Sequence, residues 1–203
     1  MSGFLLLGIL IAGATPAVAY DPDNLVPNGY TYAPCQNQTL NTSSIVCQTD
    51  NGGVSVYITS SVSVAMEDRV RATLDGSYDP ISGISIAYVT TPSYSGSSET
   101  DIVYQQGSMP APNLAGVYWC DDAVDGYLYK CDQGYVRFVT STTYERRALT
   151  CHETGHAFGL LHGSQADPFT VNSSAKLGCM RSPFDADNWE LLSNNSTQIR
   201  DTY

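Results

Sequence analysis

Alternation of apolar and polar residues predicts the first strand of the fold. From Val54 the stretch "VSVYITSSV" alternates with the period of a half-buried β-strand. Met66, Val70 and Leu74 then recur every four residues with charged residues between them. This spacing predicts an amphipathic helix that ends near Gly76.

Four shorter apolar stretches follow and predict four more strands. They are residues 84–90, 101–105, 116–119 and 135–141. Between the last two lies "CDDAVDGYLYKC", which is typical of a hairpin-like excursion. Thr142 and Glu145 fit a capping box, so we expect a second helix from about Thr143 into "CHETGHAFGLLH". The C-terminal "NNSTQIRDTY" is weakly helical, with Ile199 and Tyr203 spaced for packing.

The first 53 residues differ from the rest of the chain. Residues 1–19 are apolar and end in "AVA", which predicts a secretory signal peptide cleaved before Tyr20, although no Lys or Arg precedes the apolar run. The alternative is a membrane anchor, for which the run is short and interrupted by Gly, Thr and Pro. Residues 20–53 are polar and predict an irregular segment held by a disulfide. Residues 54–203 are expected to form one domain.

The charge balance excludes several kinds of partner. The chain has 9 Lys and Arg against 20 Asp and Glu, a net charge of −11. Such a chain does not bind nucleic acid by neutralising phosphates, and it gains nothing at an anionic membrane surface. We therefore expect no nucleic-acid partner and no stable membrane association. We also expect the chain to be secreted, because of its signal peptide, and to be a monomer.

The six cysteines predict three disulfides in an exported chain, although fifteen pairings are possible. We favour Cys35–Cys47 and Cys120–Cys131, because each closes a short polar loop. Two acidic stretches, "CDDAVDG" and "SPFDADNWE", are candidates for Ca²⁺. Neither has a defined loop signature, so solvated acidic loops are the preferred interpretation.

All three histidines of the chain lie in "CHETGHAFGLLH". His152 and His156 are four residues apart, so both imidazoles lie on one face of a helix and reach one ion. Glu153 points about 100° around the helix, away from a metal but towards a water bound to it. His162 joins the site only if the helix ends and the chain turns back. Gly159 lies between them and tolerates the left-handed conformation of a helix stop.

Three neutral imidazoles leave the fourth position of a zinc ion open, which is typical of a catalytic site. Zinc lowers the pKa of its bound water, and Glu153 would take the proton and pass it to the leaving amine. The alternative is a helix that simply packs through Phe158 and Leu161. That alternative does not explain why every histidine falls at metal spacing around one glycine, so we favour Zn²⁺ binding.

Residues 152–162 match the signature HExxHxxGxxH, and the chain resembles the metzincin metalloproteases. That clan also has a methionine in a tight turn beneath the zinc. Met180 in "LGCMRSP" is the candidate, because every other methionine precedes the zinc helix. The resemblance does not cover residues 20–53.

The resemblance implies an α+β fold. It has a twisted, mostly parallel five-stranded sheet with one antiparallel edge strand, a backing helix, an active-site helix and a small C-terminal subdomain. The stretch "GVYW" (116–119) is the candidate edge strand, which would bind an extended peptide by strand addition. A protected, inert edge is the alternative. Residues 181–189 are expected to shape the specificity pocket.

The resemblance also implies the third disulfide, Cys151–Cys179, because the two segments meet under the metal in such a fold. Thiolate ligation by these cysteines would overfill a tetrahedral site.

Ser182 stands where astacins and serralysins have a tyrosine ligand, so no such ligand is expected. In this respect the chain looks more like the small matrixin-like or snapalysin-like bacterial proteases. Cys35 would block the zinc, as in latent matrix metalloproteinases, only if it were unpaired.

The function that the resemblance implies is a secreted zinc endopeptidase acting on extended peptides, with Glu153 as the general base. A non-catalytic, zinc-stapled binding protein is the first alternative, although it has no need of Glu153. A different zinc hydrolase, acting for instance on cell-wall amides, is the second.

Overall fold

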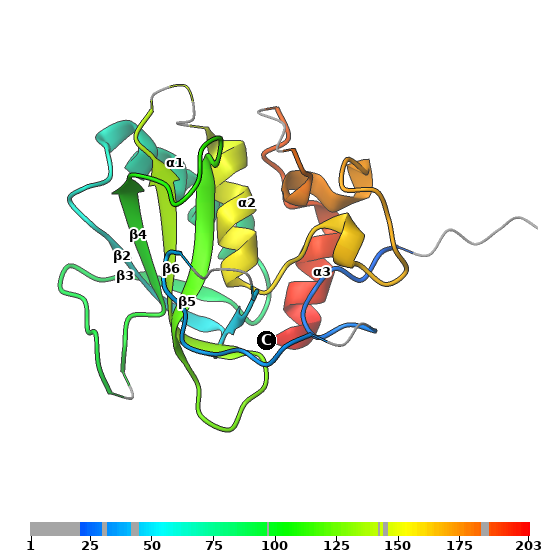
Figure 1. Cartoon of the computed structure of the whole chain (residues 1–203), viewed down its shortest axis with the longest axis horizontal. Helices are drawn as coiled ribbons and strands as arrows, with labels where there is room; N and C mark the ends of the chain where they lie inside the picture. The colour runs from blue at the N-terminus through cyan, green and yellow to red at the C-terminus, as the bar shows by residue number, and fades with distance from the viewer. Residues whose placement is uncertain are drawn as a thin grey trace, which may run out of the picture.

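The computed structural model describes residues 21–29, 32–41, 45–96, 98–141, 143, 146–183 and 187–203. The predicted signal peptide and both side chains of the predicted capping box, Thr142 and Glu145, lie outside the described residues. Figure 1 shows a sheet on one side of the molecule, α2 (Arg147–Ala157) beside it, and the C-terminal part beyond α2.

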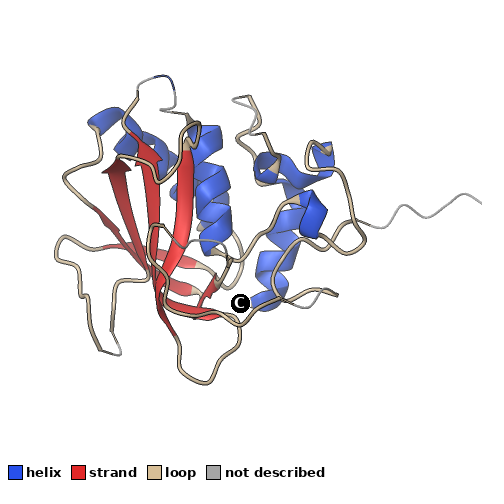
Figure 2. Ribbon diagram, viewed as in Figure 1, coloured by secondary structure: helices blue, strands red, loops and turns tan. Residues whose placement is uncertain are grey.

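The sheet has six strands and is mostly parallel (Figure 2). They are β1 Gln48–Thr49, β2 Gly53–Ile58, β3 Ser85–Tyr88, β4 Ile102–Gly107, β5 Gly116–Ala123 and β6 Lys130–Val139. The order is β1-β6-β4-β2-β3 with parallel pairing throughout, and β5 pairs antiparallel with β6. The expected mostly parallel sheet is confirmed, but the count of five strands is wrong. The sixth strand, β1, is too short to leave an alternating pattern.

Two helices pack on one face of this sheet. α1 (Val64–Thr73) starts at Ser63, whose hydroxyl accepts the Met66 N–H, and continues as a π-helical turn, η1 (Leu74–Tyr78). The helix therefore runs slightly past the predicted end near Gly76. α1 lies against α2, and α2 contacts β5 and β6.

The predicted start of the second helix near Thr143 is wrong. α2 begins at Arg147, because Arg146 is extended (φ −121°, ψ 138°) and makes no side-chain cap hydrogen bond. The chain between β6 and α2 is therefore longer than the capping pattern indicated.

The C-terminal part packs on the far side of α2. It contains two short 3₁₀ turns, η3 (Gly163–Gln165) and η4 (Ala175–Met180), followed by α3 (Leu192–Thr202). Ile199 is fully buried and the Tyr203 ring packs edge-on against Phe158, 5.8 Å between centroids. The predicted packing of these two C-terminal residues is confirmed.

All three expected disulfides form: Cys35–Cys47, Cys120–Cys131 and Cys151–Cys179. The first two lie next to each other in a small buried cluster separate from the main core. Because Cys35 is paired, it is not available to block a metal. Disulfides are typical of chains that fold in oxidising surroundings. Within the described residues, every helix is too short or too polar to cross a bilayer.

Candidate metal centre

α2 presents His152 and His156 on one face, with ring centroids 4.9 Å apart. The Nδ1 of His152 lies 2.8 Å from the carbonyl oxygen of Cys179, and the Nδ1 of His156 lies 2.7 Å from that of Leu160. A carbonyl oxygen only accepts hydrogen bonds, so each ring donates from Nδ1. Each neutral ring then keeps a free lone pair on Nε2, the atom that faces the site.

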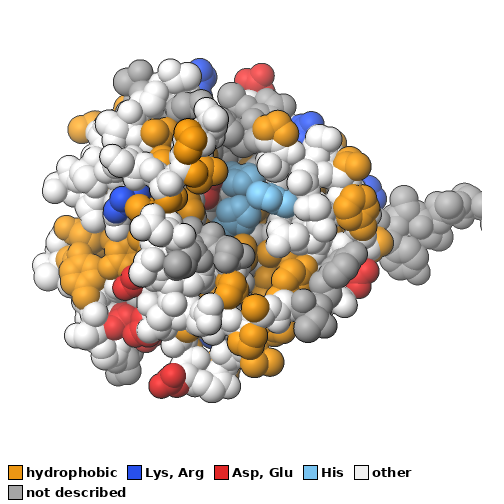
Figure 3. Space-filling view, in the orientation of Figure 1, with side chains coloured by type: hydrophobic (Ala, Val, Ile, Leu, Met, Phe, Trp, Pro, Cys, Tyr) orange, Lys and Arg blue, Asp and Glu red, His pale blue; other side chains and the backbone are white. Residues whose placement is uncertain are grey.

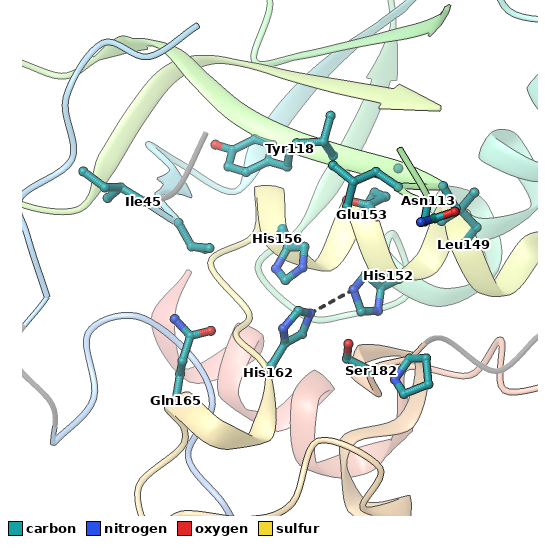
Figure 4. A pocket seen from close by; sticks show the side chains of 16 residues that line it. Ile45, Asn113, Tyr118, Leu149, His152, Glu153, His156, His162, Gln165 and Ser182 are labelled. Carbon is teal, nitrogen blue, oxygen red and sulfur yellow. Dashed lines mark hydrogen bonds between the residues drawn. The ribbon is translucent and has the colours of Figure 1, made fainter. Parts of the chain in front are cut away.

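The chain turns back directly after α2. Gly159 has a φ of 88°, in the left-handed region, and a Cβ at this position would lie 2.9 Å from the Cβ of Gln48. The turn returns His162 to the helix, where its Nε2 lies 3.1 Å from the Nε2 of His152. Figure 4 shows the three imidazoles pointing towards one another. The structure therefore brings together the three histidines that the sequence singled out.

The N-terminal segment holds this returning loop in place. The N–H of Val26 donates to the carbonyl of Gly159 (3.0 Å), and the N–H of Leu161 donates to the carbonyl of Asn24 (2.6 Å). The side-chain amide of Asn24, fully buried, donates to the carbonyl of Leu161 (2.9 Å). Sequence reasoning missed this support, because backbone-mediated pairing leaves no residue pattern.

The donor set fits a zinc ion. One nitrogen from each histidine lies within 4.8 Å of the other two. Two nitrogens on one tetrahedral zinc lie about 3.3 Å apart, since each bond is about 2.0–2.1 Å. The distance of 3.1 Å between His152 and His162 is close to that value.

Other candidate ligands in the described part of the chain do not form a comparable site. Cys35, Cys47 and Cys120 also lie close together, but disulfides occupy their sulfurs. The acidic residues of 120–126 do not gather into a group of three ligands, and Asp185 lies outside the described residues. The suggested calcium sites therefore gain no support.

Burial sets the charge of the site in the metal-free protein. Desolvation lowers the pKa of His152 to about 4 and lowers the pKa of His156 and of His162 as well. All three rings are therefore neutral at physiological pH, the form that binds a metal. Desolvation raises the pKa of Glu153 to about 8. A cation between the imidazoles would lower that pKa by favouring the carboxylate.

Glu153 lies against the start of β5. Its side chain is 6% exposed, and Figure 4 shows it on the β5 side of the three imidazoles. A Cβ on Gly116 would lie 2.5 Å from the Cγ and Oε1 of Glu153. Gly116 therefore leaves the space that the carboxyl group occupies, a role that its place at a strand start did not reveal.

Met180 lies beneath α2, against the helical turn that joins His152 to His156. A Cβ on Gly155 would lie 2.2 Å from the Met180 sulfur, so only glycine allows this approach. The preceding Cys179 is bonded to Cys151 and accepts the hydrogen bond of His152. The segment of Met180 therefore supports the first imidazole directly. A glycine inside a helical pattern was the sequence signal for this close contact.

The imidazoles lie at the bottom of a cleft of about 510 Å³. Figure 3 shows them in a hollow on the surface. The other lining residues are Ile45, Val46, 113–118, Leu149, Glu153, Gln165, Ser182 and Pro183. Of the expected pocket segment 181–189, Ser182 and Pro183 line the cleft, 184–186 lie outside the described residues, and Trp189 stacks on Arg147 at 4.1 Å.

No protein-family model matches the chain, and no curated protein matches it. The site itself combines three neutral nitrogen donors, one carboxyl group and an open cleft beside a sheet edge. This combination suits metal-assisted hydrolysis of a substrate that lies in the cleft.

Proposed function

We propose that the protein is a zinc-dependent endopeptidase of the metzincin type. His152, His156 and His162 would hold the ion, and Glu153 would act as general base. The observation that carries the proposal is the convergence of three imidazole nitrogens within 4.8 Å at the bottom of a cleft that also contains a buried carboxyl group. Met180 and the Cys151–Cys179 disulfide would form the floor of the site.

The side chains divide the chemistry between them. When bound, zinc supplies Lewis-acid polarisation and favours deprotonation of water at neutral pH. Glu153 takes a proton from the attacking water and later gives it to the amine nitrogen that leaves. The low exposure of Glu153 keeps bulk water from competing for that proton. The carbonyls of Cys179 and Leu160 hold His152 and His156 in the tautomer that directs Nε2 at the ion.

β5 is the substrate-binding strand in this proposal. It pairs with β6 on one side, and Gly116, Val117 and Tyr118 line the cleft. An extended peptide would add to its outer edge, so that main-chain hydrogen bonds place the scissile bond over the imidazoles. This arrangement favours peptides over a compact amide substrate.

The position of Glu153 argues against a zinc-stapled binding protein. A structural zinc site is closed by four protein ligands, whereas only three converge here in the described residues. Burying a carboxyl group has a free-energy cost, which its raised pKa reflects. A purely structural site gains nothing from that cost.

The test is Glu153→Ala in zinc-loaded protein. The variant should keep stoichiometric zinc by elemental analysis while casein cleavage falls by at least about 100-fold, the lower range for a general base. Chelation should abolish wild-type cleavage, and zinc should restore it.

Glu67→Ala is the matched control, because Glu67 pairs with Arg71 on the surface of α1. It should cleave casein at the wild-type rate. Undiminished cleavage by Glu153→Ala would disprove the mechanism.

A further inference from the structure

The outer edge of β5 is short. The carbonyl of Ala115 accepts the Val139 N–H on the β6 side (2.9 Å), whereas the carbonyl of Cys120 accepts the Gln38 N–H on the opposite side (2.8 Å). Alternate residues of a strand direct their N–H and C=O groups to the same side. Gly116 and Tyr118 therefore share the outward side with Cys120, whose carbonyl is already taken.

The segment that occupies this position is stapled to the β5–β6 hairpin. We call it the disulfide loop: described residues 35–41 and 45–47, closed by Cys35–Cys47. The N–H of Cys35 donates to the carbonyl of Leu128 (2.6 Å), and the Asn37 side chain accepts the N–H of Ala123 (2.8 Å). Its disulfide packs against Cys120–Cys131. The loop is therefore a fixed part of the sheet edge.

Gln38 connects this edge to the cleft. Its side chain is 4% exposed, donates to the carbonyl of Ile45 (2.9 Å) and accepts the Ile45 N–H (3.4 Å). Ile45 and Val46 line the cleft. Figure 4 shows Ile45 at one end of the cleft and Asn113 at the other, with the imidazoles between them.

We propose that the disulfide loop closes the substrate groove at one end. The proposal rests on the proposed peptidase function. On the Ile45 side a peptide gains main-chain contacts with Gly116 and Tyr118, and at Cys120 it meets a strand position that Gln38 already fills. The substrates are peptides whose recognised part on that side of the scissile bond is two or three residues long.

Two series of peptides test the proposal. Both contain one cleavage site and are lengthened one residue at a time, up to six, on the N-terminal or the C-terminal side. Wild-type kcat/KM is measured for each peptide, and Kd is measured by calorimetry with zinc-loaded Glu153→Ala. In one series kcat/KM should rise, and Kd should fall, about three- to tenfold for each residue that adds a hydrogen bond. The gain should end after the second or third residue.

Two variants identify the cause of that plateau. Gln38→Pro removes the N–H that fills the Cys120 carbonyl, and Ile45→Gly removes the wall side chain. In each variant the next residue of the same series should improve binding and kcat/KM about three- to tenfold: through the freed Cys120 carbonyl in Gln38→Pro, and through the space opened at the end of the cleft in Ile45→Gly. Leu128→Ala is the control, because this side chain is 59% exposed and lies outside the cleft lining. It should keep the wild-type plateau.

Several results would overturn the closed groove. One is a gain that continues to the sixth residue in both wild-type series. Another is an unchanged plateau in a variant that is folded by circular dichroism; Ile45→Gly alone decides if Gln38→Pro does not fold. If no peptide is cleaved but the Kd values show the plateau and its release, the peptidase proposal fails and the closed groove stands.

Discussion

The two halves of the metal centre are held by different means. His152 and His156 lie on one helix, so their separation follows from the helical repeat. His162 lies on a loop whose position depends on hydrogen bonds with Asn24 and Val26, more than 130 residues earlier in the chain. Local helix geometry therefore positions two of the three histidines, while long-range pairing positions the third.

The helical half has its own internal supports. The hydroxyl of Tyr78 donates to the carbonyl of Cys151 (2.8 Å), and the hydroxyls of Tyr104 and Thr154 share a buried hydrogen bond (2.8 Å). The Cys151–Cys179 disulfide adds a covalent tie. The two hydroxyl contacts hold α2 as a whole rather than a single imidazole. Losing one of them should therefore lower the stability of the fold more than the affinity for zinc.

The largest expected effect comes from removing the loop half altogether. His162→Ala should weaken zinc binding more than the about 10- to 100-fold that is typical of losing a supporting second-shell partner. His152 and His156 alone offer two nitrogens, which is too few for a stable site. Competition with a chromophoric chelator measures the affinity.

Ser182→Ala is the control for this prediction. Ser182 lines the same cleft but offers no imidazole nitrogen, so its replacement should leave zinc affinity unchanged. Equal affinity of His162→Ala and wild type would show that the loop histidine is not a ligand.

Acid should separate the two halves in the metal-free protein. The folded-state pKa of His152 is about 4, below its unfolded value of about 6.5. Its neutral form therefore contributes stability fully above pH 6.5, and this contribution is lost as pH falls towards 4. The shift corresponds to at most about 3 kcal/mol. His162 is only partly buried, so it should contribute less.

Glu153 titrates in the opposite sense and must be removed from this measurement. Its folded-state pKa of about 8 lies above its unfolded value, so its contribution is lost as pH rises from about 4.5 to 8. Chemical unfolding of metal-free Glu153→Gln between pH 4 and 7 isolates the histidines. Adding His152→Gln should flatten the curve more than adding His162→Gln. The reverse order would contradict the difference in burial.

The same contrast explains what could be predicted from the sequence. Local sequence patterns predict the two histidines on one helix face, the order of strands and helices along the chain, and the helix stop at Gly159. β1 leaves none, because two residues cannot show an alternation. Asn24 leaves none either, because its backbone and amide act on a segment that is distant in sequence.

Close contacts between a glycine and a side chain distant in sequence were a second feature of the site that could not be predicted. Gly116 and Gly155 matter because another side chain, Glu153 or Met180, fills the space above them. Sequence shows that a glycine is present but not which neighbour approaches it. The cleft wall at Ile45 was missed for the same reason.

A smaller effect is expected at the helix stop that joins the two halves. Gly159→Ala places a side chain at a φ of 88°, which costs about 1–2 kcal/mol, and its Cβ would crowd Gln48. Both the free energy of unfolding and zinc affinity should fall.

Gly126→Ala separates strain from site effects. Gly126 has a similar φ of 80° but open space around it. Its free energy of unfolding in urea should fall by a similar amount, without any loss of zinc affinity. If Gly159→Ala also left zinc affinity intact, the turn would not control the position of His162.

The smallest expected losses of zinc affinity come from removing one hydrogen bond in each half, and they distinguish the two halves best. Asn24→Ala leaves the buried Leu161 carbonyl without its amide partner, and Tyr104→Phe removes the bond to Thr154 on α2. Each should cost about 1–2 kcal/mol of unfolding free energy in the metal-free protein. Only Asn24→Ala should also weaken zinc binding, by up to about tenfold, the lower range for a lost supporting contact. Similar losses of zinc affinity in the two variants would mean that the loop is held as rigidly as the helix, because the long-range contacts would then add nothing specific to the third imidazole.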